Sequence, residues 1–250
     1  MPAGRLVLIS VRAAWHARCS WTGALWQRIS TMTTQRPSVP KPERRIETDP
    51  TQRPGTLDEC RRCPLWHDAT QGVGGVGPAH AAIMMVGEQP GDSEDREGRP
   101  FVGPAGRLLD DALREAGVTR GTVFVTNAVK HFKWEPRGKR RMHKTPAQRE
   151  VDACRYWLER ELARVSPRVV VALGSTALKA LLQDAHVRLQ DYVGKATAYD
   201  GRTILATWHP SYALRAPDSE TRKRAYADIV GTLAEANRIV EKRGSGKQPD

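Results

Sequence analysis

The sequence predicts an α/β protein in which a parallel sheet of four strands is flanked by helices. Between residues 81 and 240, short apolar runs alternate with longer segments whose apolar residues recur at helical spacing. The short runs are apolar throughout, as is typical of parallel strands buried on both faces. Such alternation favours a sheet with helices on both sides. With 250 residues, the chain is long enough for one domain of this kind with extensions.

Four apolar runs are long enough for buried strands. The first ends at Gly87 and the second ends just before Asn127. The four expected strands are Ala82–Val86, Val123–Thr126, Val169–Leu173 and Thr203–Thr207.

Four helices are expected between and after these strands. The first, Pro104–Ala116, has apolar residues at helical spacing and Gly117 as a stop signal. The second is expected to start with Thr145 as N-cap, Pro146 at the first position and Gln148 closing a capping box, and to run to about Val165. The other two are Ser175–Leu182 and Ser219–Val240.

The two ends of the chain differ from its middle. Residues 1–42 contain no Asp or Glu and six Arg or Lys, and a Pro-rich polar run continues to residue 54. We expect residues 1–54 to be a disordered extension and linker, or to include sequence upstream of a true start at Met32. A targeting segment and a DNA-binding arm are alternatives. The folded domain is expected at 55–242, with a disordered tail at 243–250.

The charge balance favours a polyanionic partner. Lys and Arg number 40 against 28 Asp and Glu, which gives a formal net charge of +12 and a pI near 10.0. Such a balance is typical of nucleic-acid-binding proteins, although it also occurs on ordinary solvated surfaces. No window approaches the roughly 18 apolar residues of a membrane span. We expect a soluble monomer without membrane contact.

The cysteines indicate a metal or redox site. Four cysteines in 250 residues do not suggest a disulfide framework. The pair Cys60 and Cys63 has the Cys-x-x-Cys spacing of metal or redox sites, and the reducing cytoplasm suits free thiols of this kind. We therefore expect a cytoplasmic protein.

Polar motifs follow three of the predicted strands. Gly87 begins the first motif, Asn127 the second and His209 the third. In parallel sheets, ligands bind outside the carboxyl ends of the strands. The sequence therefore predicts that these motifs converge on one site.

Four segments together resemble the iron–sulfur uracil-DNA glycosylases. They are Gly87–Asp92 (GEQPGD), Val125–His131 (VTNAVKH), the helix that carries Cys154, and His209–Ser211 (HPS). The loop Gly138–His143 (GKRRMH) is similar to that of the X-type branch of this group. The resemblance extends from about Cys60 to Arg215. It implies a uracil-DNA glycosylase-like fold with an iron–sulfur cluster and excision of uracil from DNA. A single-stranded substrate is preferred, because it avoids the cost of unpairing.

The resemblance implies roles for the residues of the strand-end motifs. Departure of uracil leaves an electron-poor sugar, which the Glu88 carboxylate suits, and an anionic base, to which His209 is suited to donate. Phe101 supplies an aromatic face, and the Asn127 carboxamide can both donate to and accept from uracil. The resemblance also implies a catalytic role for Gln89 and substrate-binding roles for Asp92, Ser211 and Arg215.

Each of these residues also has a structural interpretation. Phe101 is equally suited to a core, Asn127 to a cap, Gly87–Asp92 to a polar turn, and a lone His-Pro such as 209–210 to a structural turn.

The basic loop carries the most specific hypothesis. Lys139, Arg140 and Arg141 are expected to hold DNA phosphates. The resemblance to the X-type branch implies that His143 attacks the sugar after the base has left and joins protein to DNA. Met142 departs from the branched aliphatic residue expected there. The alternatives are an ordinary surface imidazole and a turnover hydrolase in which His143 only contacts the product.

For the metal, the resemblance implies a [4Fe–4S] cluster. Cys60, Cys63 and Cys154 match three of the four ligand positions, and the remaining one falls on His131, a departure from four cysteines. Histidine also ligates iron–sulfur centres, so a Cys3His set is expected. The alternatives are Cys19 as fourth ligand, a structural zinc, and, as another class of protein, a non-catalytic zinc-bearing module that binds nucleic acid.

Overall fold

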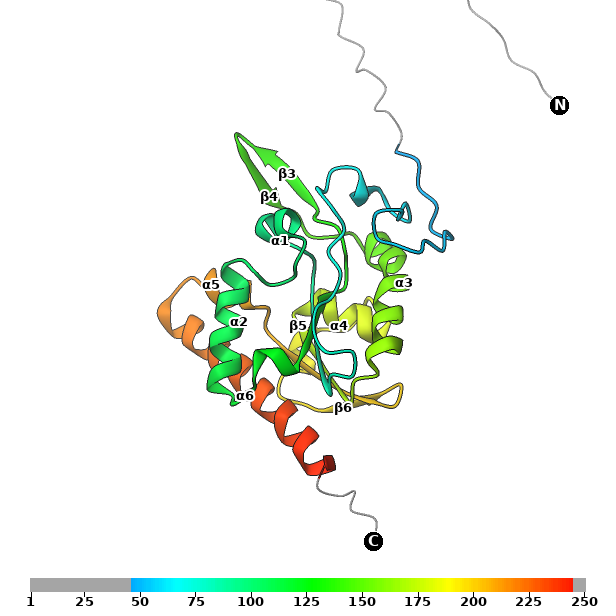
Figure 1. Cartoon of the computed structure of the whole chain (residues 1–250). Coiled ribbons are helices and arrows are strands. Elements are labelled where there is room, and N and C mark those ends of the chain that lie inside the picture. The colour runs from blue at the N-terminus through cyan, green and yellow to red at the C-terminus, as the bar shows by residue number, and fades with distance from the viewer. Residues whose placement is uncertain (1–45, 245–250) are drawn as a thin grey trace, which may run out of the picture. The chain divides into compact units, whose positions relative to one another are not determined.

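The computed structural model describes residues 46–244, which form a five-stranded sheet between helices and a separate two-stranded hairpin (Figure 1). Most of the predicted extension, including Met32 and Cys19, and most of the predicted tail lie outside the described residues. The sheet order is β2-β1-β5-β7-β6. The strands are β1 (Ile83–Gly87), β2 (Phe124–Asn127), β5 (Val169–Leu173), β6 (Thr197–Tyr199) and β7 (Arg202–Thr207).

All four predicted strands form and pair in parallel, but the prediction of four strands was wrong by one. The additional strand, β6, is a three-residue edge strand that pairs antiparallel with β7. Asp200 and Gly201 connect the two strands with φ angles of 49° and 72°. An Asp-Gly pair with positive φ is a strong hairpin signal, which the apolar pattern does not reveal.

The predicted basic loop is a β-hairpin. Strand β3 (Trp134–Arg137) pairs antiparallel with β4 (Arg140–His143) around Gly138 and Lys139. Gly138 has a φ of 61°, so this two-residue turn uses the freedom of glycine at its first central position. The hairpin stands apart from the main sheet (Figure 1). It places His143 at its base and Lys139 at its turn.

All four predicted helices form, and two short ones were missed. The missed helices, α1 and α5, are six and five residues long, too short for a helical repeat to be recognised. The α-helices are α1 (Asp92–Glu97), α2 (Pro104–Glu115), α3 (Gln148–Val165), α4 (Ser175–Leu182), α5 (Pro210–Leu214) and α6 (Ser219–Gly244). The 3-10 helices are η1 (Pro64–Trp66), η2 (Arg120–Thr122) and η3 (Leu189–Asp191).

The predicted start of α3 was wrong by two residues. Its N-cap is Ala147, and the Glu150 carboxylate accepts the Ala147 N–H at 2.7 Å. Thr145 and Pro146 therefore precede the helix. None of the helices within residues 46–244 is long and apolar enough to cross a membrane.

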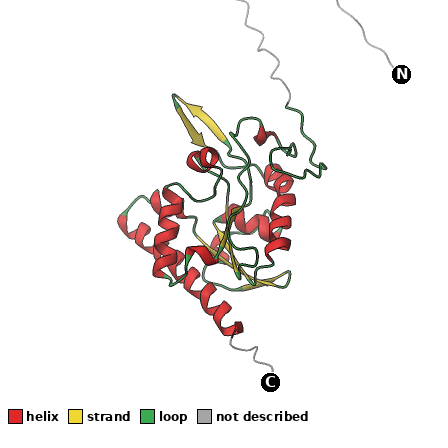
Figure 2. Cartoon of the chain, viewed as in Figure 1, coloured by secondary structure: helices red, strands yellow, loops and turns green. Residues whose placement is uncertain are grey.

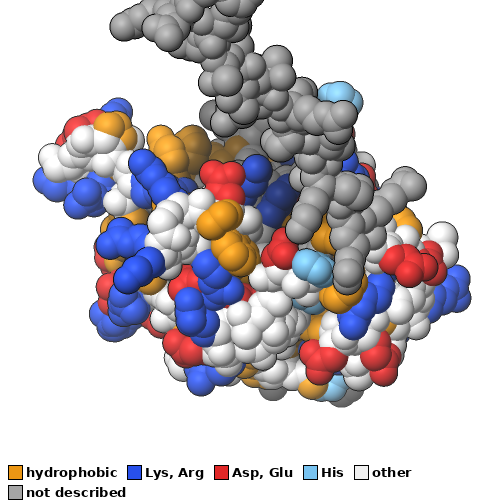
Figure 3. All heavy atoms as spheres, turned by 90° about the horizontal axis from the view of Figure 1, so that it is seen from above, with side chains coloured by type: hydrophobic (Ala, Val, Ile, Leu, Met, Phe, Trp, Pro, Cys, Tyr) orange, Lys and Arg blue, Asp and Glu red, His pale blue; other side chains and the backbone are white. Residues whose placement is uncertain are grey.

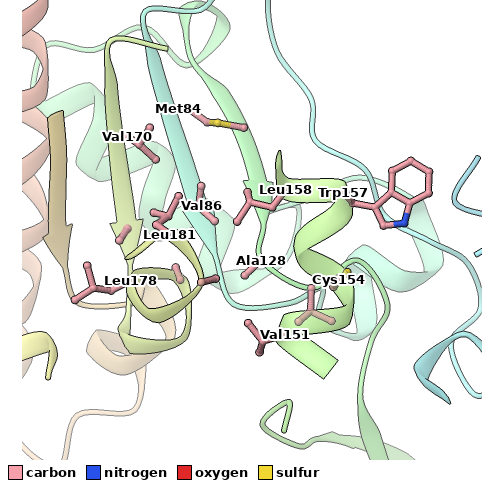
Figure 4. Packing of buried hydrophobic residues seen from close by; sticks show 14 of the residues in the cluster. Met84, Val86, Ala128, Val151, Cys154, Trp157, Leu158, Val170, Leu178 and Leu181 are labelled. Carbon is pink, nitrogen blue, oxygen red and sulfur yellow. The ribbon is translucent and has the colours of Figure 1, made fainter. Parts of the chain in front are cut away.

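Helices cover both faces of the sheet, and each face has its own core. Helices α3 and α4 lie on one side, and α2, α5 and α6 on the other (Figure 2). Met84 and Val86 of β1 join the first core, shown in Figure 4, while Ile83 and Met85 join the second. Because successive strand residues face opposite sides, burial on both sides explains why the strands are apolar throughout. Each such fully buried side chain stabilises the fold by about 1.5–3 kcal/mol.

Candidate active site

A cavity of about 400 Å³ lies at the carboxyl ends of β1, β2 and β7, where the sequence predicts the site. Nine of the twelve predicted catalytic and substrate-binding residues line it. They are Glu88, Gln89, Asp92, Phe101, Asn127, His143, His209, Ser211 and Arg215. Figure 3 looks down on the end of the domain that bears the hairpin and shows Lys and Arg side chains gathered on one part of the visible face. The cavity therefore brings together most of the predicted catalytic and substrate-binding groups.

Asn127 and Phe101 form a wall of the cavity beside Gly87. Asn127 is 2% exposed, and its Oδ1 has no hydrogen-bond partner within residues 46–244. A Cβ at Gly87 would lie 2.4 Å from that oxygen and 2.6 Å from Cζ of Phe101. Glycine is required here so that the carboxamide and the ring can approach the end of β1. The wall thus offers an aromatic surface and an acceptor that lacks a donor.

Phe101 is held in a backbone conformation unusual for a large side chain. Its φ is +56°, and it also belongs to the core on the α2 side of the sheet. A Cβ at Gly106 would lie 1.8 Å from the Phe101 carbonyl oxygen, so α2 packs directly on this backbone. Backbone strain of this kind persists where the surroundings enforce it and is common at ligand sites. The structural and the functional interpretations of Phe101 therefore both fit its position.

The Glu88 carboxylate is shared between two partners. Its Oε1 lies 3.3 Å from His143 Nε2, and its Oε2 accepts the Thr176 hydroxyl at 2.5 Å. Burial opposes ionisation of Glu88, but the hydrogen bonds from His143 and Thr176, with His209 nearby, hold its pKa below the ordinary value. Glu88 is therefore an anion at neutral pH. Sequence reasoning missed Thr176, although it follows the carboxyl end of β5 as the predicted motifs follow their strands.

His209 is a neutral imidazole with a defined tautomer. Its Nδ1 accepts the Ser211 N–H at 3.1 Å, which caps α5. Burial lowers the pKa of His209 to about 4, although Glu88 works in the opposite direction. With Nδ1 acting as an acceptor, the proton resides on Nε2. His209 can therefore donate a hydrogen bond without carrying charge.

Removing the Thr176 hydroxyl should weaken the ionisation of Glu88. In Thr176→Val, one hydrogen bond that lowers the Glu88 pKa is lost, so the carboxylate becomes protonated at a higher pH. Facing groups other than Thr176 are His143 and His209, which remain. We expect the uracil excision that the family resemblance implies to lose rate at a higher pH in this variant than in the wild type as the solution is acidified, with little change at alkaline pH. Thr176→Ser should restore the profile; an unchanged acidic limb in Thr176→Val would contradict this role.

The hairpin is held at its base by Gln89. The Gln89 Nε2 donates to the carbonyl oxygens of Lys133 and Lys144, at 3.1 Å each, and Oε1 accepts the Lys133 N–H at 3.0 Å. These backbone groups flank β3 and β4, so one amide fixes both strands. The prediction placed Gln89 among the catalytic residues. The structure gives its amide a positioning contact with the element that carries His143.

The three predicted phosphate contacts differ in their surroundings. Arg141 is only 14% exposed and pairs through Nε with Asp92, at 2.5 Å, and through Nη1 with Asp95, at 2.6 Å. Burial would lower its pKa, but these carboxylates raise it above the ordinary value. Lys139 and Arg140 are exposed at the hairpin turn. Arg141 therefore anchors the hairpin within the protein, and the other two face solvent.

The three predicted cysteine ligands are buried and close enough to influence one another. Trp157 Nε1 donates to Cys60 Sγ at 3.3 Å, and the Lys130 N–H donates to Cys154 Sγ at 3.2 Å. Burial, together with the neighbouring thiols, raises the pKa of Cys63 to about 11 and that of Cys154 to about 12. Hydrogen bonds to buried sulfur are also a feature of iron–sulfur sites. This donor set fits a thiolate-ligated cluster.

His131 lies in the same part of the domain but faces Gly72. Burial lowers its pKa to about 4, so the imidazole is neutral and suitable as a ligand. A Cβ at Gly72 would lie 3.2 Å from His131 Nε2. Across residues 46–244, no three His, Cys, Asp or Glu side chains are grouped closely enough to hold a single metal ion.

Comparisons with known proteins agree with this site. The family model for the uracil DNA glycosylase superfamily matches residues 75–231. The chain is 37% identical over 189 residues to the type-4 uracil-DNA glycosylase of Thermotoga maritima, covering 75% of this chain and 93% of the relative. It is 41% identical over 170 residues to the type-4 enzyme of Pyrobaculum aerophilum, covering 64% and 82%. A type-5 uracil-DNA glycosylase of the same organism is 32% identical over 172 residues, covering 62% of this chain and 73% of the relative. With the cavity at the strand ends, these matches show that the chain belongs to the uracil DNA glycosylase superfamily.

Proposed function

We propose that the protein excises uracil from DNA as a repair enzyme and that His143 then bonds covalently to the exposed sugar, as the X-type branch does. The observation that carries this proposal is the 3.3 Å contact between His143 Nε2 and Glu88 Oε1 inside the cavity. It puts a nucleophile beside the anion that would stabilise a cationic sugar. The type-4 relatives support the excision step.

Base recognition rests on Asn127, Phe101 and His209. Uracil presents one N–H donor between two carbonyl acceptors, so the unpartnered Asn127 Oδ1 is suited to that N–H. The Phe101 ring provides the face on which the flipped base stacks. His209 Nε2–H donates to the carbonyl on which negative charge develops as the base leaves. Because His209 is neutral, it donates this hydrogen bond without first forming an ion pair with Glu88.

Capture follows departure of the base. The bond between sugar C1′ and uracil N1 breaks, its electron pair leaves with uracil, and a cationic centre forms at C1′. The Nε2 proton of His143 passes to the Glu88 carboxylate as the Nε2 lone pair forms a bond to C1′, and Glu88 later loses that proton to water. Before this transfer, the Glu88 carboxylate stabilises the positive charge at C1′. The product is an alkylated imidazole joined to DNA.

The DNA backbone is proposed to lie over the exposed side of the cavity. Lys139 and Arg140 at the hairpin turn, together with Arg215 and Ser211 of the cavity, are available for phosphate contacts. Asp92 is part of the Arg141 anchor. The protein is proposed to act as a monomer on single-stranded DNA, with residues 55–242 as the folded domain.

The second candidate is a conventional glycosylase that releases an abasic site, and the type-4 names of the relatives favour it. One experiment separates the two. The protein is incubated with single-stranded DNA that contains one deoxyuridine, and the mixture is denatured and run on a gel. A shifted band that requires the deoxyuridine supports capture, whereas an abasic product without a shifted band supports turnover. Matched DNA with thymidine in place of deoxyuridine is the control.

We propose that Cys60, Cys63, Cys154 and His131 hold a [4Fe–4S] cluster. When bound, the cluster would link the segment around η1 to helix α3 as a structural element. The buried thiols support this set, since soft thiolates are the preferred ligands of iron–sulfur clusters. A zinc site remains the competing proposal, and a non-catalytic zinc-bearing module the least favoured one. A visible spectrum separates them, because a [4Fe–4S] protein is brown and a zinc protein colourless.

Substitution of His131 tests the fourth ligand. We expect His131→Ala to lose iron or stability and His131→Cys to retain the cluster, because thiolate can replace imidazole as a ligand. Cys19→Ser should leave iron content unchanged. Iron per protein and the visible absorption are measured on the purified proteins. Full iron content in His131→Ala would contradict the Cys3His set.

A further inference from the structure

A second cavity of about 370 Å³ adjoins the uracil cavity and has no role in the steps above. Glu88 and His209 line both cavities. A DNA strand that places its uridine against these two residues therefore has the second cavity beside it. Its other walls come from α4, the segment around η3, and the residues at the start of α5.

One wall is a rigid aromatic platform. Trp208 and Tyr212 stack with ring centroids 4.9 Å apart and an interplanar angle of 23°. Trp208 Nε1 donates to Asp228 Oδ2 at 2.8 Å, which fixes its ring. Tyr212 is 41% exposed and lines the cavity. An exposed aromatic ring held by a second ring is suited to stacking with a nucleobase.

Two cations line the same cavity. Lys179 comes from α4, and its Nζ has no hydrogen-bond or ion-pair partner among residues 46–244. Arg188 pairs with Asp191 at 3.0 Å, and both of these side chains are half or more exposed. Exposed pairs of this kind are worth little, so Arg188 can exchange partners at small cost. An aromatic platform with nearby cations has the composition of a site for single-stranded nucleic acid.

We propose that this cavity, lined by Lys179, Arg188, Trp208 and Tyr212, is a neighbour subsite that binds the nucleotide next to the uridine. The base stacks on Tyr212, and the adjoining phosphate contacts Lys179 and Arg188. This inference rests on the proposed function. It adds that the protein reads an unpaired nucleotide on one side of the uridine, because the base of a paired neighbour would not be free to stack on Tyr212.

The test uses single-stranded oligonucleotides that differ by one base. The first has an intact thymidine on each side of a single deoxyuridine. In the second the 5′ neighbour, and in the third the 3′ neighbour, is a stable tetrahydrofuran residue that lacks a base. We expect the second-order rate of uracil release by the wild-type protein to fall roughly 10-fold when the base is missing on one side only, the size typical of base–aromatic stacking. Loss of the same base should have no further effect in Tyr212→Ala.

Tyr212→Phe should retain the wild-type preference, because the ring remains. Lys179→Gln should weaken the salt dependence of DNA binding. Arg164→Gln should not, because Arg164 lies near the end of α3 that precedes β5, at the amino ends of the strands and away from the cavity. Melting temperature and iron content show that each variant is folded. Equal wild-type rates on all three oligonucleotides, or equal slowing of all three by Tyr212→Ala, would overturn the subsite. Absence of uracil release from every oligonucleotide would instead reject the proposed function.

Discussion

Replacing His143 with serine should abolish the denaturation-resistant complex with uracil-containing DNA while an abasic site still accumulates. In the proposed mechanism, His143 acts as the nucleophile only after the base has left, and its removal would allow water to reach the sugar carbon. The hairpin should remain in place, because Gln89 and Arg141 hold it through groups that the substitution does not change. Denaturing gels report the complex, and alkaline cleavage of the DNA reports the abasic site.

The control is His186→Ser, since His186 is an exposed histidine outside both cavities. This variant should form the complex as the wild type does. Mass spectrometry of the digested complex should place the added mass on the peptide that contains His143. An adduct on another peptide, or a complex that persists in His143→Ser, would rule out capture by this residue and make the conventional hydrolase the better explanation.

Replacing His209 or Asn127 should reduce both the abasic product and the covalent complex. In His209→Ala, the developing anion loses its donor, and loss of one such donor costs about 10²–10³-fold in rate. In Asn127→Ala, the base loses a buried partner at the end of β2. Single-turnover rates of uracil release measure the first product, and the gel measures the second.

Asn237→Ala on α6 is the matched control, because its side chain contacts Glu241 outside the cavity. Its rates should equal those of the wild type. If His209→Ala still formed the complex at the wild-type rate, departure of the base would not depend on this donor. Base recognition and capture would then have to be assigned to other groups.

The strands and the location of the site could be predicted because both depend on patterns along the chain. Burial on two faces requires unbroken apolar strands, and a parallel sheet brings the ends of those strands together. The motifs that begin at Gly87, Asn127 and His209 therefore converge, and Glu88, Asn127 and His209 line one cavity. The hairpins at Gly138 and Asp200–Gly201 were missed because their signals are in the turns and not in apolar periodicity.

The surroundings of individual side chains could not be predicted, because they depend on contacts distant in sequence. Arg141 has the same charge as Lys139 and Arg140, but only Arg141 faces the carboxylates of Asp92 and Asp95. Gln89 adjoins Glu88 in sequence, yet its amide contacts the main chain of Lys133 and Lys144. Short acidic helices such as α1 lack an apolar face, so no apolar pattern in the sequence predicts them.

The attachment of the hairpin has a consequence for protein engineering. His143 lies on an element outside the main sheet, whose position depends on Gln89, Asp92 and Asp95 from another part of the chain. Transplanting residues 133–144 alone into a glycosylase that turns over would transfer the nucleophile without the groups that aim it. A successful graft must carry both halves of the interface. Transfer of the proposed capture function would therefore require two segments, the hairpin with His143 and the segment that carries Gln89 and helix α1.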